Sequence, residues 1–291
     1  MMNFDRVLFP VDFSDPCRRA APFVRAVAKH FRSELVMFYV LQVPPPWYPP
    51  DAAPEFQSLA DLDELRAQRR ADLQNFLSEE FRDLAVRREM AEGEPAVQIV
   101  KSAQQENVSL IMMPTHGYGP LRVLLLGSVT AKVLDDAQCP VWTAVHTNEL
   151  QAQPPERWRR ILCAVELNTD ALRVVRWAAD LARTEGADLC VMHAVDEVDP
   201  DSTWPEESTR EWIRETARQK LGAMLQDYVR GVDRRLAIEF GDPASAVRAA
   251  AMRREADIVV IGRGAANGPL GRLRTHTYAI IRQSPCPVFR V

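Results

Sequence analysis

The chain has 291 residues, of which 47% are hydrophobic and 26% charged, and this ordinary globular composition excludes global disorder. The net charge of −4 disfavours electrostatically driven binding to nucleic acid or to an anionic membrane. Five cysteines stand far apart, and no pair has the spacing of a zinc ribbon or a redox motif. No signal peptide and no apolar run of about 20 residues is visible. We therefore expect a soluble, cytoplasmic protein.

The two halves of the chain repeat one another, so the chain is predicted to hold two duplicated domains. Four segments of the first half recur in the same order in the second half: residues 6–12 and 160–166, 92–96 and 240–244, 109–113 and 257–261, and 138–141 and 285–288. A polar stretch that contains Pro154 and Pro155 separates the halves. We predict domains over residues 1–148 and 157–291, joined by a linker over 149–156.

Short apolar runs alternate with longer amphipathic stretches in each half. In the first half the apolar runs predict strands over residues 7–11, 35–43, 86–90, 110–113 and 141–145. The helices between them are predicted from Ser14 (a potential cap, with Pro16 in the first turn), along a run of leucines from 59 to 84, from Pro95 to about Glu106, and from about Ser128. Five such units per half predict an α/β fold with a parallel, doubly wound sheet and helices on both faces.

Ligands of such sheets bind beyond the carboxyl ends of the strands, at the point where the strand order reverses. If the first strand lies beside the fourth, Asp12 and residues 114–128 meet across one crevice. Asp12 is then either an N-terminal helix cap or an acceptor for ribose hydroxyls, and its position modestly favours the second role.

Gly127 and Ser128 lie where a helix is predicted to begin, which is a potential anion site. Gly117 would let the backbone approach a ligand closely. The alternative is that Gly127 only ends a loop and Ser128 only caps the helix, and the residues alone leave both interpretations open. His116 has no partners at ligand spacing and is interpreted as a loop residue rather than a base or a metal ligand.

Other catalytic and binding motifs are missing from the sequence. There is no Walker loop, no G-x-G-x-x-G after the first strand and no G-x-S-x-G elbow. Trp47 and Tyr48 can shield a base, or can equally cover a sheet edge. We predict no catalytic residue and no protein-bound metal site.

In these features the sequence resembles the universal stress protein family in its tandem form. The family's nucleotide signature is G-x2-G-x9-G-[S/T], and Gly117, nine residues and then Gly127-Ser128 match its last part. Pro114 stands where the first glycine is expected and removes one backbone donor. The resemblance implies two Rossmann-like domains of the adenine nucleotide alpha hydrolase-like type, each a five-stranded parallel sheet.

The resemblance also implies an ATP site, with magnesium, in the N-terminal domain. Asp12 would hold the ribose, Val40 would present backbone to the adenine, and the segment from Gly117 to Ser128 would hold the phosphates. The full set of implied nucleotide-binding residues is Pro10, Asp12, Val40, Met113, Gly117, Gly127, Ser128 and Val129.

The second half departs from the signature. Glu166 replaces the aspartate, Ala265 stands at the second glycine, and Arg274-Thr275 stands at Gly-Ser. We expect the second site to be degenerate and to serve assembly. In the family, fifth strands pair at their edges, so 141–145 and 288–291 are expected to form an intrachain pseudo-dimer, with a homodimer as a further step.

Three functions follow from this resemblance. The first is a cytoplasmic stress-response protein that binds ATP or another adenine nucleotide as a sensor or switch, with an unknown protein partner and neither nucleic acid nor membrane. The second is an interaction and oligomerisation protein of the same fold that binds no nucleotide. The third, ranked last because no general base is placed, is a slow ATPase or an autophosphorylating protein.

Overall fold

The computed structural model describes residues 2–43, 59–115, 126–144, 154–195, 207–225, 234–264 and 272–291. The chain divides into two compact units. Phe4–Val123 and Gly127–Cys139 form the N-terminal unit, and the C-terminal unit consists mainly of Pro140–Val291. Residues 149–153 of the predicted linker lie outside the described residues.

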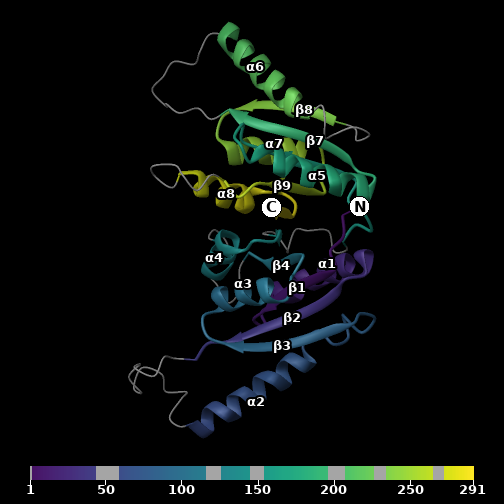
Figure 1. The fold of residues 1–291 in the computed structure, drawn as a ribbon, viewed down its shortest axis with the longest axis vertical. Helices are drawn as coiled ribbons and strands as arrows, with labels where there is room; N and C mark the ends of the chain where they lie inside the picture. The colour runs from purple at the N-terminus through teal and green to yellow at the C-terminus, as the bar shows by residue number, and fades with distance from the viewer. Residues whose placement is uncertain are drawn as a thin grey trace. The chain divides into compact units, whose positions relative to one another are not determined.

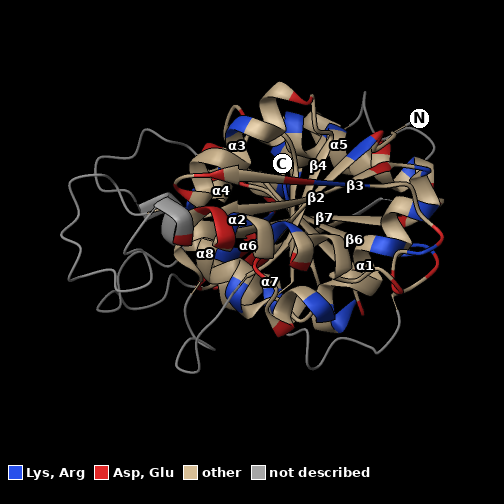
Figure 2. Cartoon of the chain, turned by 90° about the horizontal axis from the view of Figure 1, so that it is seen from below, with Lys and Arg blue, Asp and Glu red and all other residues tan. Residues whose placement is uncertain are grey.

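The N-terminal unit alternates strands and helices, as its apolar periodicity predicts (Figure 1). Its strands are parallel and lie in the order β3-β2-β1-β4. Figure 2 shows α3 and α4 on one side of these strands and α1 on the other. The elements are β1 (Arg6–Val11), α1 (Asp15–Phe31), β2 (Glu34–Leu41), α2 (Leu59–Asn75), β3 (Val86–Glu92), α3 (Pro95–Gln105), β4 (Leu110–Pro114) and α4 (Ser128–Asp136).

The C-terminal unit repeats this alternation, with strands in the order β5-β10-β9-β6-β7-β8. The α/β fold with Rossmann-like repeats predicted from the sequence is therefore confirmed. The elements are β5 (Val141–Ala144), β6 (Arg160–Ala164), α5 (Ala171–Glu185), β7 (Asp188–Val195), α6 (Glu207–Leu225), β8 (Arg234–Phe240), α7 (Pro243–Arg253), β9 (Ile258–Ile261), α8 (Arg272–Gln283) and β10 (Val288–Arg290).

The last strand of each half pairs with the other. Strands β5 and β10 are antiparallel, with Phe289 opposite Trp142 and Arg290 opposite Val141. The other strand pairs among the described residues of this unit, β10–β9, β6–β7, β6–β9 and β7–β8, are parallel. The strand pairing expected from residues 141–145 and 288–291 thus occurs, and it places the fifth strand of the first half in the C-terminal unit.

One turn that links a strand to a helix is built twice, by the repeated motif at 93–96 and 241–244. Gly93 and Gly241 have φ angles of 127° and 117°, a region that glycine adopts without a Cβ clash. The carboxylates of Glu94 and Asp242 then accept a hydrogen bond from a backbone N–H of the first turn of α3 and α7, each at 2.8 Å. The duplication is therefore structural as well as sequential.

Two local predictions from the sequence are wrong. The helix predicted as far as residue 84 ends at Asn75, because Leu77 takes a left-handed φ of 53° that a helix cannot continue through. Ser14 occupies the N-cap position of α1, but its side chain makes no capping hydrogen bond. The Ser14 backbone N–H instead donates to the carboxylate of Asp12.

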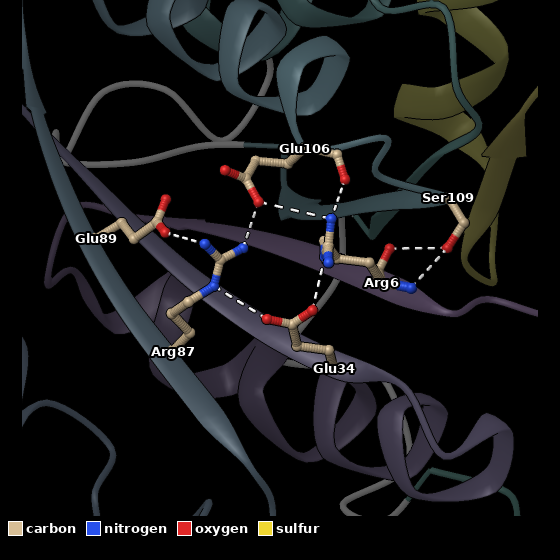
Figure 3. A network of polar contacts seen from close by, with 6 residues as sticks. All are labelled: Arg6, Glu34, Arg87, Glu89, Glu106 and Ser109. Atoms are coloured by element: carbon tan, nitrogen blue, oxygen red, sulfur yellow. Dashed lines mark hydrogen bonds and ion pairs between the residues drawn. The ribbon is translucent and has the colours of Figure 1, made fainter.

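A network of charges joins the amino-terminal ends of the strands in the N-terminal unit (Figure 3). The Glu34 carboxylate accepts hydrogen bonds from Arg6 Nε at 2.7 Å and Arg87 Nε at 3.0 Å. Both guanidiniums also contact the Glu106 carboxylate at the end of α3. These hydrogen bonds hold the pKa of Glu34 and of Glu106 below the ordinary value for glutamate. The network thus lies at the amino-terminal ends of the strands, and the candidate site lies at their carboxyl ends.

Candidate functional site

A pocket of about 1010 Å³ opens at the carboxyl ends of β1, β2 and β4 in the N-terminal unit. This volume lies at the upper end of the range of about 300–1,000 Å³ that small-molecule and cofactor sites occupy. The structure brings seven of the eight residues implied by the family signature to its wall, and Gly117 lies outside the described residues. The seven are Pro10, Asp12, Val40, Met113, Gly127, Ser128 and Val129.

Asp12 directly follows β1 and lines the pocket. One oxygen of its carboxylate, Oδ1, accepts hydrogen bonds from the Ser14 backbone N–H and from Cys17 Sγ, each at 3.1 Å. Burial raises the pKa of the Cys17 thiol well above its usual range, and the charge of Asp12 raises it further. The thiol therefore stays protonated and acts as a donor to the carboxylate.

The first turn of α4, after β4, forms another part of the pocket wall. Gly127 takes the N-cap position, and its own N–H donates to the Thr115 carbonyl at 2.9 Å. The backbone N–H groups of Ser128, Val129 and Thr130 belong to the first turn, where a helix has no internal acceptors. All three residues line the pocket, so this wall presents donors and the positive end of a helix dipole to an anion.

Pro114 ends β4 and also lines the pocket. It supplies no N–H, but its carbonyl accepts a hydrogen bond from the buried Thr130 hydroxyl at 3.1 Å. This bond ties the first turn of α4 to the end of β4. The departure from the family signature thus removes a donor without releasing the helix.

A wall that the sequence analysis missed comes from α2. Three residues on one face of α2 line the pocket, and a fourth follows directly after the helix at the same spacing: Leu65, Arg69, Asp72 and Phe76. Arg69 and Asp72 form an ion pair at 3.0 Å. The helical spacing of these residues is the signal in the sequence that could have identified this wall.

Aromatic side chains join the α2 wall to the end of β1. Phe13 has a left-handed φ of 63° and stacks on Tyr39, with 4.7 Å between ring centroids. It also meets Phe76 edge-on, and the Arg18 guanidinium lies 4.6 Å from the centroid of the Phe76 ring. Burial raises the pKa of Tyr39 above its ordinary value. All of these residues line the pocket beside Asp12.

The corresponding pocket of the C-terminal unit measures about 90 Å³, below the range of ligand sites. Glu166 lines it and accepts a hydrogen bond from Asn168 Nδ2 at 2.9 Å. A Cβ at Gly262 would lie 2.9 Å from Val174 Cγ2, so side chains crowd the end of β9. The side chain of Arg274, together with Ala265, His116, Trp47 and Tyr48, lies outside the described part of the chain.

None of the helices within the described ranges has the length and apolar composition that crossing a bilayer requires. In the same ranges, no three His, Cys, Asp or Glu side chains are grouped as metal ligands would be.

Comparisons with known proteins agree with the repeat and with the fold. The model of the universal stress protein family matches residues 3–144 and 157–291. Universal stress protein MJ0531 of Methanocaldococcus jannaschii is 33% identical over 138 residues, which cover 47% of this chain and 80% of that protein. A universal stress protein of Thermus aquaticus is 30% identical over 141 residues, which cover 47% of this chain and 96% of that protein.

Among solved structures, a universal stress protein from Archaeoglobus fulgidus matches 99% of this chain and 96% of its own chain. Its TM-score is 0.70 at 21% sequence identity, a likeness that shows the shared fold. Because the family model matches each half once, the chain belongs to the universal stress protein family and carries two such domains in tandem.

Proposed function

We propose that the N-terminal unit binds an adenine nucleotide, ATP in the first instance, as a sensor or switch in the stress response. The observation that carries this proposal is the pocket of about 1010 Å³, whose wall holds both a carboxylate and the amino-terminal turn of a helix. A nucleotide offers the matching groups, since ribose hydroxyls donate to a carboxylate and phosphates accept from free N–H groups.

Three groups of residues contact the three parts of the proposed ligand. Asp12 accepts the ribose hydroxyls, and the Val40 backbone contacts the adenine, with Pro10 and Met113 as apolar lining. The phosphates lie at the first turn of α4, over Gly127, Ser128 and Val129. Magnesium is expected to bind together with the nucleotide, because Mg²⁺ is usually held by substrate phosphates and only one or two protein carboxylates.

Calorimetric titration with Mg-ATP tests this proposal, with Gly127→Arg as the blocking variant. Gly127 has a φ of −61°, which any residue adopts, so the backbone accommodates the arginine. Because Gly127 lines the pocket, the added side chain is expected to occupy the place proposed for the phosphates. We expect one nucleotide per chain in the wild type and in Arg274→Ala, the matched variant of the second half, and none in Gly127→Arg. Two nucleotides per chain would contradict the degenerate second site.

ADP, AMP and adenosine separate the roles of the two walls. Affinity should fall stepwise from ATP to adenosine, because each lost phosphate removes acceptors for the first turn of α4. GTP should bind more weakly than ATP if the Val40 backbone recognises adenine. Equal affinity for adenosine and ATP would overturn the assignment of the phosphates to α4.

The rival function is an interaction protein of the same fold that binds no nucleotide. Pro114, which lacks an N–H, and the pocket of about 90 Å³ in the second unit favour it. Absence of heat on titration and an unchanged Tm in millimolar Mg-ATP would support this rival, because a ligand that binds only the native state raises stability. Phosphate release above that of Gly127→Arg would instead support slow hydrolysis. The cytoplasmic location and the homodimer stay predictions.

A further inference from the structure

Within the described part of the chain, Cys17 is the side chain that donates to the carboxylate lining the pocket. It lies in the first turn of α1 and is only 2% exposed. Its sulfur is 3.1 Å from Asp12 Oδ1, whereas its other acceptor, the Pro10 carbonyl oxygen, is 4.0 Å away. The S–H hydrogen is therefore directed at Asp12.

Both hydrogen bonds to Asp12 reach the same oxygen. Oδ1 accepts from the Ser14 N–H and from Cys17 Sγ, and Oδ2 accepts no hydrogen bond from the described residues. A carboxylate held on one oxygen by two donors keeps its plane fixed, while its second oxygen is left for a ligand. Such preorganisation raises affinity, because the side chain is ordered before the ligand arrives.

The second half has no thiol at the corresponding position. Ala171 stands at the position of Cys17 and is also 2% exposed, in the first turn of α5. Glu166 stands at the position of Asp12, and the amide Nδ2 of Asn168 donates to its Oε2. The second half therefore has neither the aspartate nor its thiol donor, and α5 begins at Ala171 itself, whereas Cys17 is the third residue of α1.

We propose that Cys17 is a positioning residue, which orients Asp12 so that Oδ2 accepts the ribose hydroxyls of the bound nucleotide. This inference rests on the proposed nucleotide function of the same pocket. It separates a role of the thiol in binding from a merely structural role, because only the first depends on whether the ligand carries ribose hydroxyls.

The test compares ATP with 2′,3′-dideoxy-ATP in wild type, Cys17→Ala and Cys17→Ser. Cys17→Ala should weaken ATP binding about fivefold, the effect of losing one ordinary hydrogen bond, and should change binding of the dideoxy nucleotide less than about twofold. Cys17→Ser keeps a hydrogen-bond donor on the atom bonded to Cβ. It should restore most of the preference for ATP over 2′,3′-dideoxy-ATP. Cys163→Ala removes a fully buried thiol from the other unit and should leave both affinities unchanged.

A second readout needs no nucleotide. The infrared S–H stretching band that Cys17→Ala removes should lie below that of Cys163 in frequency and should rise in Asp12→Ala. Loss of ATP and dideoxy-ATP affinity in equal measure, or an S–H band unaffected by Asp12→Ala, would overturn the role of Cys17. Failure of the wild type to bind either nucleotide would instead overturn the proposed function, and the inference with it.

Discussion

The Thr130 hydroxyl donates a 3.1 Å hydrogen bond to the Pro114 carbonyl and so fixes the first turn of α4 to the last residue of β4. Thr130 is 4% exposed, and the bond is buried. Thr130→Val should destabilise the protein by about 1–3 kcal/mol, because the Pro114 carbonyl is left buried without this donor. It should also weaken ATP binding, since the helix terminus loses its anchor. Chemical denaturation and calorimetry measure the two effects.

Thr143 provides the matched control for this substitution. It is 1% exposed, and its hydroxyl makes no hydrogen bond within the described part of the chain. Thr143→Val therefore removes a buried hydroxyl that has no partner and should be neutral or stabilising. Equal losses in Thr130→Val and Thr143→Val would show that the bond to Pro114 contributes nothing specific.

Because the backbone of Phe13 is left-handed, we predict that glycine is a more stable replacement than alanine at this position, the reverse of the usual order. Phe13→Ala loses the contacts with Tyr39 and Phe76 but keeps a φ of 63°, which costs a residue with a Cβ about 1–2 kcal/mol. Phe13→Gly loses the same contacts without that cost, so it should be the more stable variant by about 1 kcal/mol. Urea denaturation of both variants checks this order.

Phe31 is the control for the Phe13 pair, because it ends α1 in ordinary helical backbone and is buried. There the alanine variant should be more stable than the glycine variant, by about 0.5–1 kcal/mol. The same order at both positions would mean that the backbone at Phe13 carries no strain.

The network around Glu34 predicts how stability depends on pH. The pKa of Glu34 is lowered in the folded state, so its contribution is complete above its unfolded value of about 4.3 and is lost as the pH falls through the folded value. Glu34→Gln should lower the Tm at pH 7, by the equivalent of about 1 kcal/mol or less because the side chain is partly exposed. The difference from wild type should shrink below about pH 4.

Glu255 offers a solvent-exposed comparison for Glu34. Its carboxylate is 2.7 Å from Arg160, but the side chain is 76% exposed. Glu255→Gln should change the Tm little at any pH, because solvent screens such a pair. A Glu34→Gln deficit that persisted unchanged at pH 3 would show that the loss is one of packing and not of charge.

Pro114→Gly tests the departure from the family signature. Glycine restores a backbone N–H at the pocket wall, and ATP binding should tighten severalfold if the phosphates lie there. The variant should also lose about 1 kcal/mol of stability, because glycine leaves the unfolded chain more freedom. Calorimetry and denaturation report the two changes separately, and unchanged affinity would mean that the ligand does not reach residue 114.

That Asp12 lines the same pocket as Gly127 and Ser128 was predictable from the sequence, although about 115 positions separate them. That prediction depended only on the order of strands in a doubly wound sheet and on the rule that ligands bind at its switch point. The pairing of β5 with β10 was expected from the family resemblance, in which fifth strands pair, and it satisfies the need of an edge strand for a partner.

Local side-chain geometry was not predictable in the same way. The hydrogen bond from Cys17 to Asp12 depends on a thiol that its apolar neighbours mark only as core. The end of α2 at Asn75 depends on the backbone of Leu77, whose residue type favours helix. In the sequence, Arg69 and Asp72 cannot be told apart from charged residues on the solvent-exposed face of a helix. Only the tertiary fold places them at the pocket wall.

Strands β5 and β10 are two stretches of one polypeptide, and this has a consequence for assembly. When an antiparallel pair joins separate chains, its population falls as the protein becomes scarce. Here the partner of β5 is always supplied by the same molecule, at an effective concentration that dilution does not change. The pairing of residues 141–144 with β10 is therefore independent of the expression level, and it persists even when the protein is scarce in the cell.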